Sequence, residues 1–326
     1  MTPDFVPATD GLDYYTGPEP ADVPVHRRSE LLASGLTDVF ISQQLTRGLL
    51  TRIRHGVYAD TQALAAADHA GRHLAHLRAA LIATTEPALA TGPSAALLHG
   101  MPISSRSLDD LHILRISDQD PRSLRRPSQH RLELPSTIIT THRNAQLDSV
   151  TIRGMPVVSR SVAAITSAHL ASFSRRVALF DSVLWSPSVS AADLAELARA
   201  WKHLGGLDDI LNALEHARRG AQSYLETLSR LALLREGLPE PQLQVPFHDR
   251  HGLIGIADMY WPYLNVVGEA DGAIKYINQD AIVNEKRREN RLRAAGLGVV
   301  RWMMSDILER PAEVADQVRR EARRAA

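Results

Sequence analysis

Three carboxylates and one lysine lie close together in the segment 257–276, ADMYWPYLNVVGEADGAIKY, which is otherwise rich in apolar, β-forming residues. They are Asp258, Glu269, Asp271 and Lys275. An acidic side chain in apolar surroundings is costly unless a cation or a hydrogen-bond donor pairs with it. Two interpretations are open. Either the acids gather around a positive charge, or they stand at strand ends in water, where a surface ion pair with Lys275 contributes little.

A hairpin that turns around residues 262–265 would bring the acids together. If it is centred between Tyr263 and Leu264, Asp258 stands opposite Glu269, and directly opposed side chains have Cβ atoms about 5 Å apart. Because side chains alternate along a strand, Asp271 shares the face of Glu269. Converging carboxylates favour a hard divalent cation with oxygen ligands, Mg²⁺ or Mn²⁺.

The elements that must position this hairpin follow the order α-β-β-β-α-β-α across residues 220–326. A helix over 223–237 carries Glu226. A charged helix over 280–296 precedes the fourth strand, and a final helix is predicted to begin with Ser305 as its N-cap. Strands are predicted at 242–249, 252–262, 263–272 and 297–304.

The segment from about 220 to 310 resembles the PD-(D/E)xK nuclease superfamily, and within it the very-short-patch-repair-like endonucleases. The residues that carry the resemblance are SYLETLSR, ADMYWPYLNVVGEADGAIKY and EKRRENRLRAAGLGVVRW. It implies a restriction-endonuclease-like α-β-β-β-α-β core and metal-assisted hydrolysis of a phosphodiester. The helix acid of the family matches Glu226, the strand aspartate matches Asp258 and the next acid matches Glu269. The carbonyl of Ala270 is implied as a further ligand of the metal ion.

The chain departs from this family at the lysine that usually stands two positions after the last acid. Asp271 occupies that position, and the resemblance implies that Lys275 substitutes for the lysine by stabilising charge on the attacking group. The charged helix is implied to face the phosphate backbone of DNA with four basic residues, Lys286, Arg287, Arg288 and Arg291.

Residues 26–60 predict two short helices and a hairpin that turns at His55 and Gly56, the outline of a winged helix-turn-helix. Thr37 is the expected N-cap of the second helix. Residues 26–58 hold five arginines against two acids. Basic residues at the end of the second helix and on the hairpin are expected to contact phosphates, and glutamines on that helix to contact base edges. The predicted DNA contacts are Arg47, Arg52, Arg54, Gln43 and Gln44. The alternative is a small interaction domain whose arginines are solvated.

The remaining segments complete the predicted organisation. Residues 1–25 contain five acids, five prolines and no Lys or Arg, which predicts a flexible acidic arm. Residues 61–160 are predicted to be α+β, and residues 161–219 to be a helical connector. The stretches LTRGLLTRIRHGVYAD and SAALLHGMPI resemble the AbiEi-type antitoxin domain, which is often fused to such a nuclease-like domain in this order. The expected fold class is a multidomain α+β or α/β protein.

Composition sets outer bounds on function. The 326 residues include no cysteine, which excludes disulfides, thiolate zinc sites and cysteine nucleophiles. Formal net charge is zero, so DNA binding would depend on local basic patches. The absence of a long apolar run predicts no membrane span, and the N-terminus lacks the pattern of a signal peptide, so we expect a cytoplasmic protein.

Two functions follow as expectations. The first is a magnesium-dependent deoxyribonuclease that the winged helix directs to DNA. The alternative is an antitoxin-like or transcriptional DNA-binding regulator whose nuclease-like domain is catalytically silent. DNA is the expected partner in both cases, and a cognate toxin or another protein is a further expected partner if the chain is antitoxin-like.

Overall fold

The computed structural model describes residues 19–84, 87–116, 136–142, 147–271 and 279–325. The fold is mixed α+β, as expected, and the described residues form three sheets. The chain divides into two compact units, which are described separately below. None of the helices in the described ranges combines the length and the apolar character needed to cross a bilayer.

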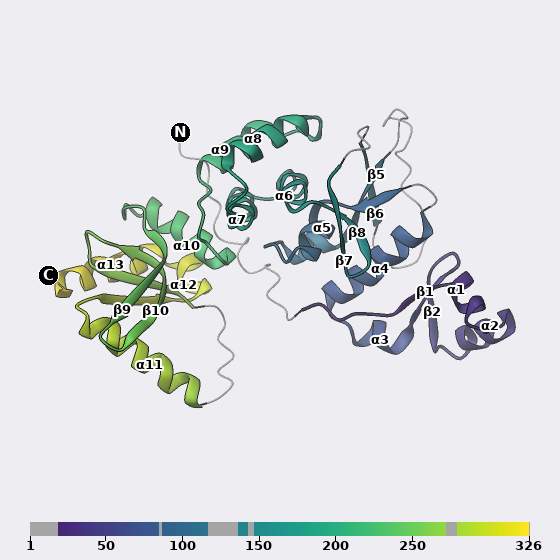
Figure 1. Cartoon of the computed structure of the whole chain (residues 1–326), viewed down its shortest axis with the longest axis horizontal. Coiled ribbons are helices and arrows are strands. Elements are labelled where there is room, and N and C mark those ends of the chain that lie inside the picture. Colours follow the sequence, from purple (N-terminus) through teal and green to yellow (C-terminus); the bar gives the residue numbers. More distant parts are fainter. Residues whose placement is uncertain (1–18, 85–86, 117–135, 143–146, 272–278, 326) are drawn as a thin grey trace. The chain divides into compact units, whose positions relative to one another are not determined.

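Within the described residues, the first unit comprises residues 19–171 and Leu194–Ile210. Its N-terminal part contains the two helices and the hairpin that the sequence predicts (Figure 1). Thr37 caps the second helix, with its hydroxyl oxygen accepting a hydrogen bond from Phe40 N at 3.2 Å. An additional strand, β1, pairs with the returning strand, so the sheet order is β1-β3-β2. The elements are β1 (Val25–Arg27), α1 (Arg28–Ala33), α2 (Asp38–Thr46), β2 (Leu50–Arg54) and β3 (Val57–Asp60).

Residues 19–25 differ from the flexible arm that composition predicts. Val23 and Val25 are buried and belong to a core shared with Ile53 on the hairpin. Arg153 donates a hydrogen bond to the carbonyl oxygen of Pro20 at 2.7 Å. Apolar side chains in this otherwise acidic segment therefore attach it to the hairpin, and residues 1–18 lie outside the described ranges.

A five-stranded sheet of order β6-β5-β4-β8-β7 forms the rest of this unit. Residues 149–158 form two antiparallel strands, β7 and β8, because Arg153 and Gly154 adopt positive φ angles of 50° and 71° and turn the chain. The elements are α3 (Thr61–Ala66), α4 (His69–Ala83), β4 (Ala88–Ala90), α5 (Gly92–Leu98), a 3₁₀ helix (Ser105–Leu108), β5 (Asp110–Ile116), β6 (Ser136–His142), β7 (Ser149–Ile152), β8 (Met155–Val158) and α6 (Arg160–Ala168).

Helices follow through residue 215, in agreement with the predicted helical character of 161–219. They are α7 (Phe173–Leu184), α8 (Ala191–Ala200), a 3₁₀ helix (Lys202–Leu204) and α9 (Leu207–Glu215). Helix α7 belongs to the second unit, which within the described residues comprises Ser172–Asp193 and the chain from Leu211 onward.

The second unit contains the predicted succession of helix, three strands, helix and strand. The final helix is divided in two, and Ser305 lies inside α12 instead of capping it. The division falls at Pro311, which lacks the N–H that a continuous helix would use. The elements are α10 (Tyr224–Arg235), β9 (Gln242–Asp249), β10 (Gly252–Trp261), β11 (Val266–Ala270), α11 (Gln279–Ala294), β12 (Gly298–Trp302), α12 (Met304–Glu309) and α13 (Pro311–Ala325).

The sheet of this unit has the order β12-β11-β10-β9, with β11 and β12 parallel and the other pairs antiparallel. One face packs against α11 through Val267, Leu292 and Val299. On the other face, a Cβ at Gly268 would collide with the indoles of Trp261 and Trp302. The close approach of these two indoles requires glycine at position 268.

Candidate functional site

Asp258 and Glu269 are cross-strand neighbours, as the hairpin predicts. The register pairs Tyr260 with Val267 and Met259 with Gly268, and the next pair in this register is Asp258 with Glu269. Asp258 Oδ2 accepts a hydrogen bond from Ala270 N at 2.9 Å. The two acids therefore occupy adjacent positions on paired strands, Asp258 inside β10 and Glu269 next to the last residue of β11.

The backbone carbonyl of Ala270 points toward the strand that carries Asp258. The next amide, Asp271 N, donates to Trp302 O on β12 at 2.9 Å. In a trans peptide the C=O and the following N–H point to opposite sides. The Ala270 carbonyl is therefore directed away from β12 and toward β10, which carries Asp258.

Glu226 enters the site from the first turn of α10. The Ser223 hydroxyl caps this helix by accepting from Glu226 N at 3.1 Å, and it also lies 2.8 Å from Glu226 Oε1. Gln222 N donates to Glu226 Oε2 at 2.9 Å. These contacts resemble a capping box, so local helix-end geometry already explains an acid at this position.

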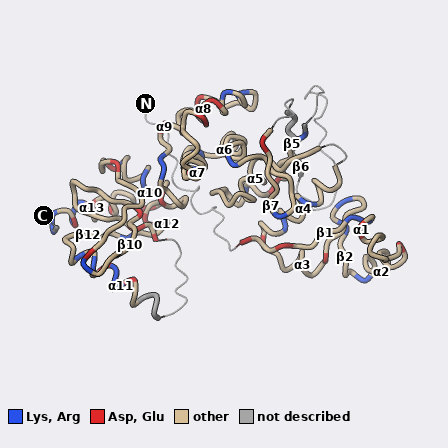
Figure 2. The backbone as a smooth tube through the Cα atoms, in the orientation of Figure 1, with Lys and Arg blue, Asp and Glu red and all other residues tan. Residues whose placement is uncertain are grey.

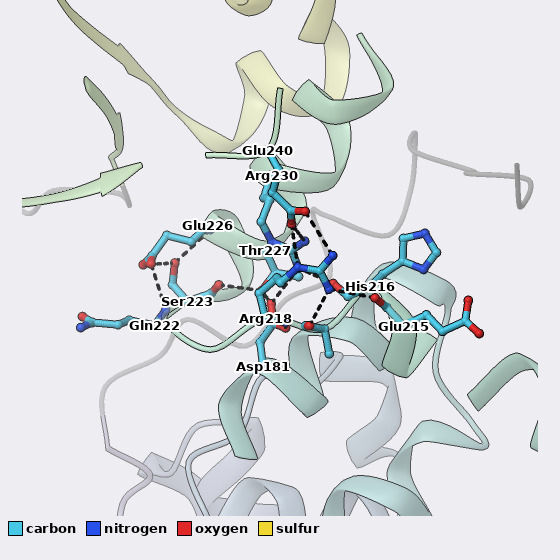
Figure 3. Close-up of polar contacts among 11 residues, drawn as sticks. Asp181, Glu215, His216, Arg218, Gln222, Ser223, Glu226, Thr227, Arg230 and Glu240 are labelled. Atoms are coloured by element: carbon cyan, nitrogen blue, oxygen red, sulfur yellow. Dashed lines mark hydrogen bonds and ion pairs between the residues drawn. The ribbon is translucent and has the colours of Figure 1, made fainter. Parts of the chain in front are cut away.

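A buried charged network fixes α10 relative to α7 (Figure 3). Asp181 Oδ2 accepts from the hydroxyl of Thr227 at 2.8 Å and lies 3.3 Å from the guanidinium of Arg230. Both charged side chains are only 1% exposed. Because Thr227 follows Glu226 directly, this network also fixes the position from which Glu226 reaches the site.

Gln244 on β9 links two of the acids, and the sequence interpretation did not identify it. Its side-chain amide nitrogen donates to Glu226 Oε2 at 3.0 Å and to Asp258 Oδ1 at 3.3 Å. The backbone of Gln244 has φ 53°, the left-handed region that a residue with a side chain seldom adopts. A neutral residue in a strand carries no spacing signal that would have marked it beforehand.

Positive charge reaches the acids from α11 and β12. The guanidinium of Arg288 binds Glu269 through two contacts, 2.7 Å to Oε2 and 3.2 Å to Oε1, and also pairs with Glu285. On β12, Arg301 lies 2.5 Å from Glu285 and 3.4 Å from Asp271. Arg288, predicted to face DNA, is thus directed into the acidic cluster.

Burial raises the pKa of the acids at this site, namely Glu226, Asp258, Glu269 and Asp271. The charge of Asp258 adds to the increase in the other three, while their hydrogen bonds and the nearby arginines act in the opposite direction. Burial is the largest single influence on Arg288 and disfavours its charge, but the hydrogen bonds and negative charges of Glu269 and Glu285 together outweigh it and raise the pKa of that guanidinium. Several perturbed acids in one place are a recognised indication of a functional site.

Basic positions, coloured blue, lie along α11 (Figure 2), and the other basic residues predicted there have different partners. Arg291 makes two short contacts with Asp249, of 2.6 and 2.8 Å. Lys286 lies 3.3 Å from Glu289, and Arg287 is exposed. Lys275, the predicted substitute for the family's lysine, lies outside the described residues.

The predicted DNA-contacting residues of the first unit are unequally accessible. Gln43, Arg47 and Arg52 are exposed, and Gln44 is half-buried. Arg54 is partly buried, donates to the hydroxyl of Thr137 at 2.8 Å and has a pKa lowered by burial. A shallow depression of about 440 Å³ follows α2, lined by Asp38, Val39, Ser42, Gln43, Thr46 and Arg47.

The donors at the acidic site are of the type that a hard divalent cation prefers: carboxylates from neighbouring strands and the Ala270 carbonyl directed to the same side. In the arrangement described, Glu269 binds Arg288 instead. Across the described ranges, no three His, Asp or Glu side chains are already grouped as metal ligands.

No protein-family model matches the chain. It is similar to two curated proteins of Mycobacterium tuberculosis, Uncharacterized protein MT2308 of strain CDC 1551 / Oshkosh and Uncharacterized protein Rv2248 of strain ATCC 25618 / H37Rv. Each is 23% identical over 282 residues, which cover 86% of this chain and 96% of the relative. The similarity is therefore not confined to either compact unit.

Proposed function

We propose that the chain is a DNA-binding protein whose second unit hydrolyses phosphodiesters with the help of a divalent cation. The observation that carries this proposal is the convergence of Asp258, Glu269 and the Ala270 carbonyl on the paired strands β10 and β11. The raised pKa values of the acids support it, because a cation would relieve the cost of burying several like charges.

The residues take the following roles in this proposal. Asp258, Glu269 and the Ala270 carbonyl would hold Mg²⁺ or Mn²⁺, which supplies an electrophile for the phosphate and a more acidic bound water. Glu226 and Gln244 keep the Asp258 carboxylate oriented through the shared amide of Gln244. The exposed face of α2 and Arg52 on the hairpin would hold the DNA by contacts with its phosphates.

Cleavage of supercoiled plasmid DNA tests this proposal. The full chain is incubated with Mg²⁺ or Mn²⁺ beside Asp258→Asn, and Asp316→Asn serves as the matched control because Asp316 is an exposed acid on α13 that pairs with Arg319. We expect Asp258→Asn to slow cleavage by about two orders of magnitude and the control to cleave normally. Absence of cleavage by the wild-type chain with either metal, or equal cleavage by Asp258→Asn, contradicts the proposal.

A second function, a DNA-binding regulator with a silent nuclease-like unit, is favoured by two observations. Glu269 is neutralised by Arg288, and the family's lysine position holds Asp271. This function predicts binding to DNA upstream of the chain's own coding region, with an affinity that falls steeply as salt increases. Tight, salt-dependent binding without cleavage would support it, and recovery of a toxin-like protein partner without any DNA binding would exclude it.

A further inference from the structure

Arg288 is built into the acidic site more firmly than a surface arginine. Its two-point contact with Glu269 is the geometry in which guanidinium and carboxylate groups bind most strongly. The side chains of Arg288 and Glu269 are 20% and 7% exposed, so water screens this pair less than a surface ion pair. Glu285, one turn earlier on α11, accepts from Arg288 Nε at 3.1 Å and holds the guanidinium from behind.

Gly255 on β10 provides the space through which Arg288 reaches Glu269. A Cβ at this position would lie 2.9 Å from Arg288 Cδ, closer than real Cβ contacts, and 3.0 Å from Nη1, so Arg288 would have to shift. Gly255 is not among the glycines with a positive φ, so its backbone conformation would accept other residues. Glycine at this position leaves the space that the Arg288 side chain occupies in its contact with Glu269.

The chemistry of the Arg288 guanidinium limits the roles that this side chain can take. A guanidinium stays charged throughout the physiological pH range and cannot act as a base, but its planar set of N–H donors suits phosphate and carboxylate oxygens. The charges of Arg288 and Arg301 both act on Asp258 as well as on Glu269. Arg301 pairs with Asp271 and Glu285, whereas Arg288 contacts Glu269 directly.

We infer that Arg288 supplies the positive charge that the site lacks at position 271, and that Arg288 and a divalent cation compete for the Glu269 carboxylate. This inference rests on the proposed function only in taking the competing cation to be Mg²⁺ or Mn²⁺. While Arg288 binds both oxygens of Glu269, its positive charge offsets the negative charge of the carboxylate and weakens the attraction of Glu269 for a metal ion. Removing the charge of Arg288 would leave the acids unbalanced and increase their attraction for Mn²⁺.

The affinity for Mn²⁺ alone tests the inference without relying on catalysis. Free Mn²⁺ is measured by electron paramagnetic resonance during titration of the full chain, for wild type, Arg288→Gln, Arg288→Lys and Glu269→Gln. We expect Arg288→Gln to bind Mn²⁺ about tenfold more tightly or better, Arg288→Lys to remain near wild type, and Glu269→Gln to bind more weakly. An Arg288→Gln affinity equal to or weaker than that of wild type overturns the inference, as does the absence of binding in every variant.

Gly255→Ala provides a second route in case Arg288→Gln does not fold. It keeps Arg288 in the chain but displaces it from Glu269, so we expect tighter Mn²⁺ binding than in wild type, by a smaller factor than for Arg288→Gln. Circular dichroism verifies folding of each variant. Unchanged or weaker affinity of a folded Gly255→Ala variant counts against the inference.

The cleavage assay separates this inference from the proposed function. If the wild-type chain fails to cleave DNA while Arg288→Gln still gains affinity for Mn²⁺, the nuclease proposal fails and the role of Arg288 stands. If the wild-type chain cleaves and Arg288→Gln gains no affinity, the nuclease proposal stands and the role of Arg288 fails. When both hold, Arg288→Lys should retain more cleavage than Arg288→Gln at saturating Mn²⁺.

Discussion

Asp258 on β10 accepts a hydrogen bond of 2.9 Å from the backbone N–H of Ala270 at the end of β11. This contact holds an acid of one strand against the residue that follows Glu269 on the next. The N–H offsets part of the cost of burying the Asp258 carboxylate, whose pKa is nevertheless raised by that burial. The site therefore carries negative charge that its own hydrogen bonds do not fully compensate.

The pH dependence of stability should reveal this charge. Burial raises the pKa values of these acids, so they bind more protons in the folded state than in the unfolded chain. Their contribution to the free energy of unfolding therefore falls as the pH rises. The fall begins at about pH 4, near the ordinary pKa of a carboxyl group, and continues through the raised pKa values. A cation can offset that loss only where the acids are ionised. We expect saturating Mn²⁺ to raise the melting temperature more at about pH 8 than at about pH 5.

Differential scanning fluorimetry at both pH values measures this difference. Asp258→Asn should reduce it, because the variant removes one of the ionising groups. An equal increase in melting temperature at the two pH values, or an undiminished difference in Asp258→Asn, would contradict the assignment of these acids as a cation site.

Two substitutions of Gln244 can separate the contribution of its side-chain hydrogen bonds to stability from the cost of its backbone conformation. Gln244→Ala loses the hydrogen bonds to Glu226 and Asp258 but keeps a side chain at φ 53°. Gln244→Gly loses the same bonds and relieves the strain, so it should be more stable than Gln244→Ala by about 1 kcal/mol. Urea unfolding measures the difference. If the two variants unfold at the same urea concentration, the strained backbone at this position carries no measurable cost.

Some features of the site were predictable from sequence, and others depended on tertiary packing. The register of β10 and β11 followed from the turn at residues 262–265, because a two-residue periodicity fixes which side chains oppose one another. The contact between Arg288 and Glu269 joins a helix to a strand across a face of the sheet, and spacing along either element does not reveal it. The break between α12 and α13 could have been predicted from Pro311, because a proline inside a helical pattern ends or kinks the helix.

The Asp181–Arg230 pair should be a strong determinant of stability in the second unit. Asp181→Asn would leave the buried Arg230 with only the partly exposed Glu240 as a counter-charge, and we expect a loss of about 3 kcal/mol, the lower end of the cost of breaking a buried pair. Urea unfolding of Asp181→Asn measures the loss. A double variant with Asp181→Leu and Arg230→Met should lose less, because it removes both charges. If Asp181→Asn were as stable as the control variant Asp316→Asn, the Asp181–Arg230 pair would contribute little to stability.

Arg52 and Arg54 should contribute differently to DNA binding although they are two residues apart. Arg52 is exposed on β2, so Arg52→Ala should weaken binding to all sequences alike and reduce the salt slope by about 1. Arg54 is partly buried and bound to Thr137, so Arg54→Ala should change the salt slope less and lower the thermal stability more. Fluorescence anisotropy at several salt concentrations provides the comparison. Identical salt slopes for wild type and Arg52→Ala would remove Arg52 from the proposed interface.

Anomalous scattering from a crystal soaked in Mn²⁺ tests the central claim most directly. We predict a peak in the anomalous difference map between the Asp258 and Glu269 carboxylates and the Ala270 carbonyl, with the Arg288 guanidinium moved away from Glu269. A map without a peak at this position under saturating Mn²⁺, and with Arg288 still bound to both oxygens of Glu269, would contradict a divalent-cation site.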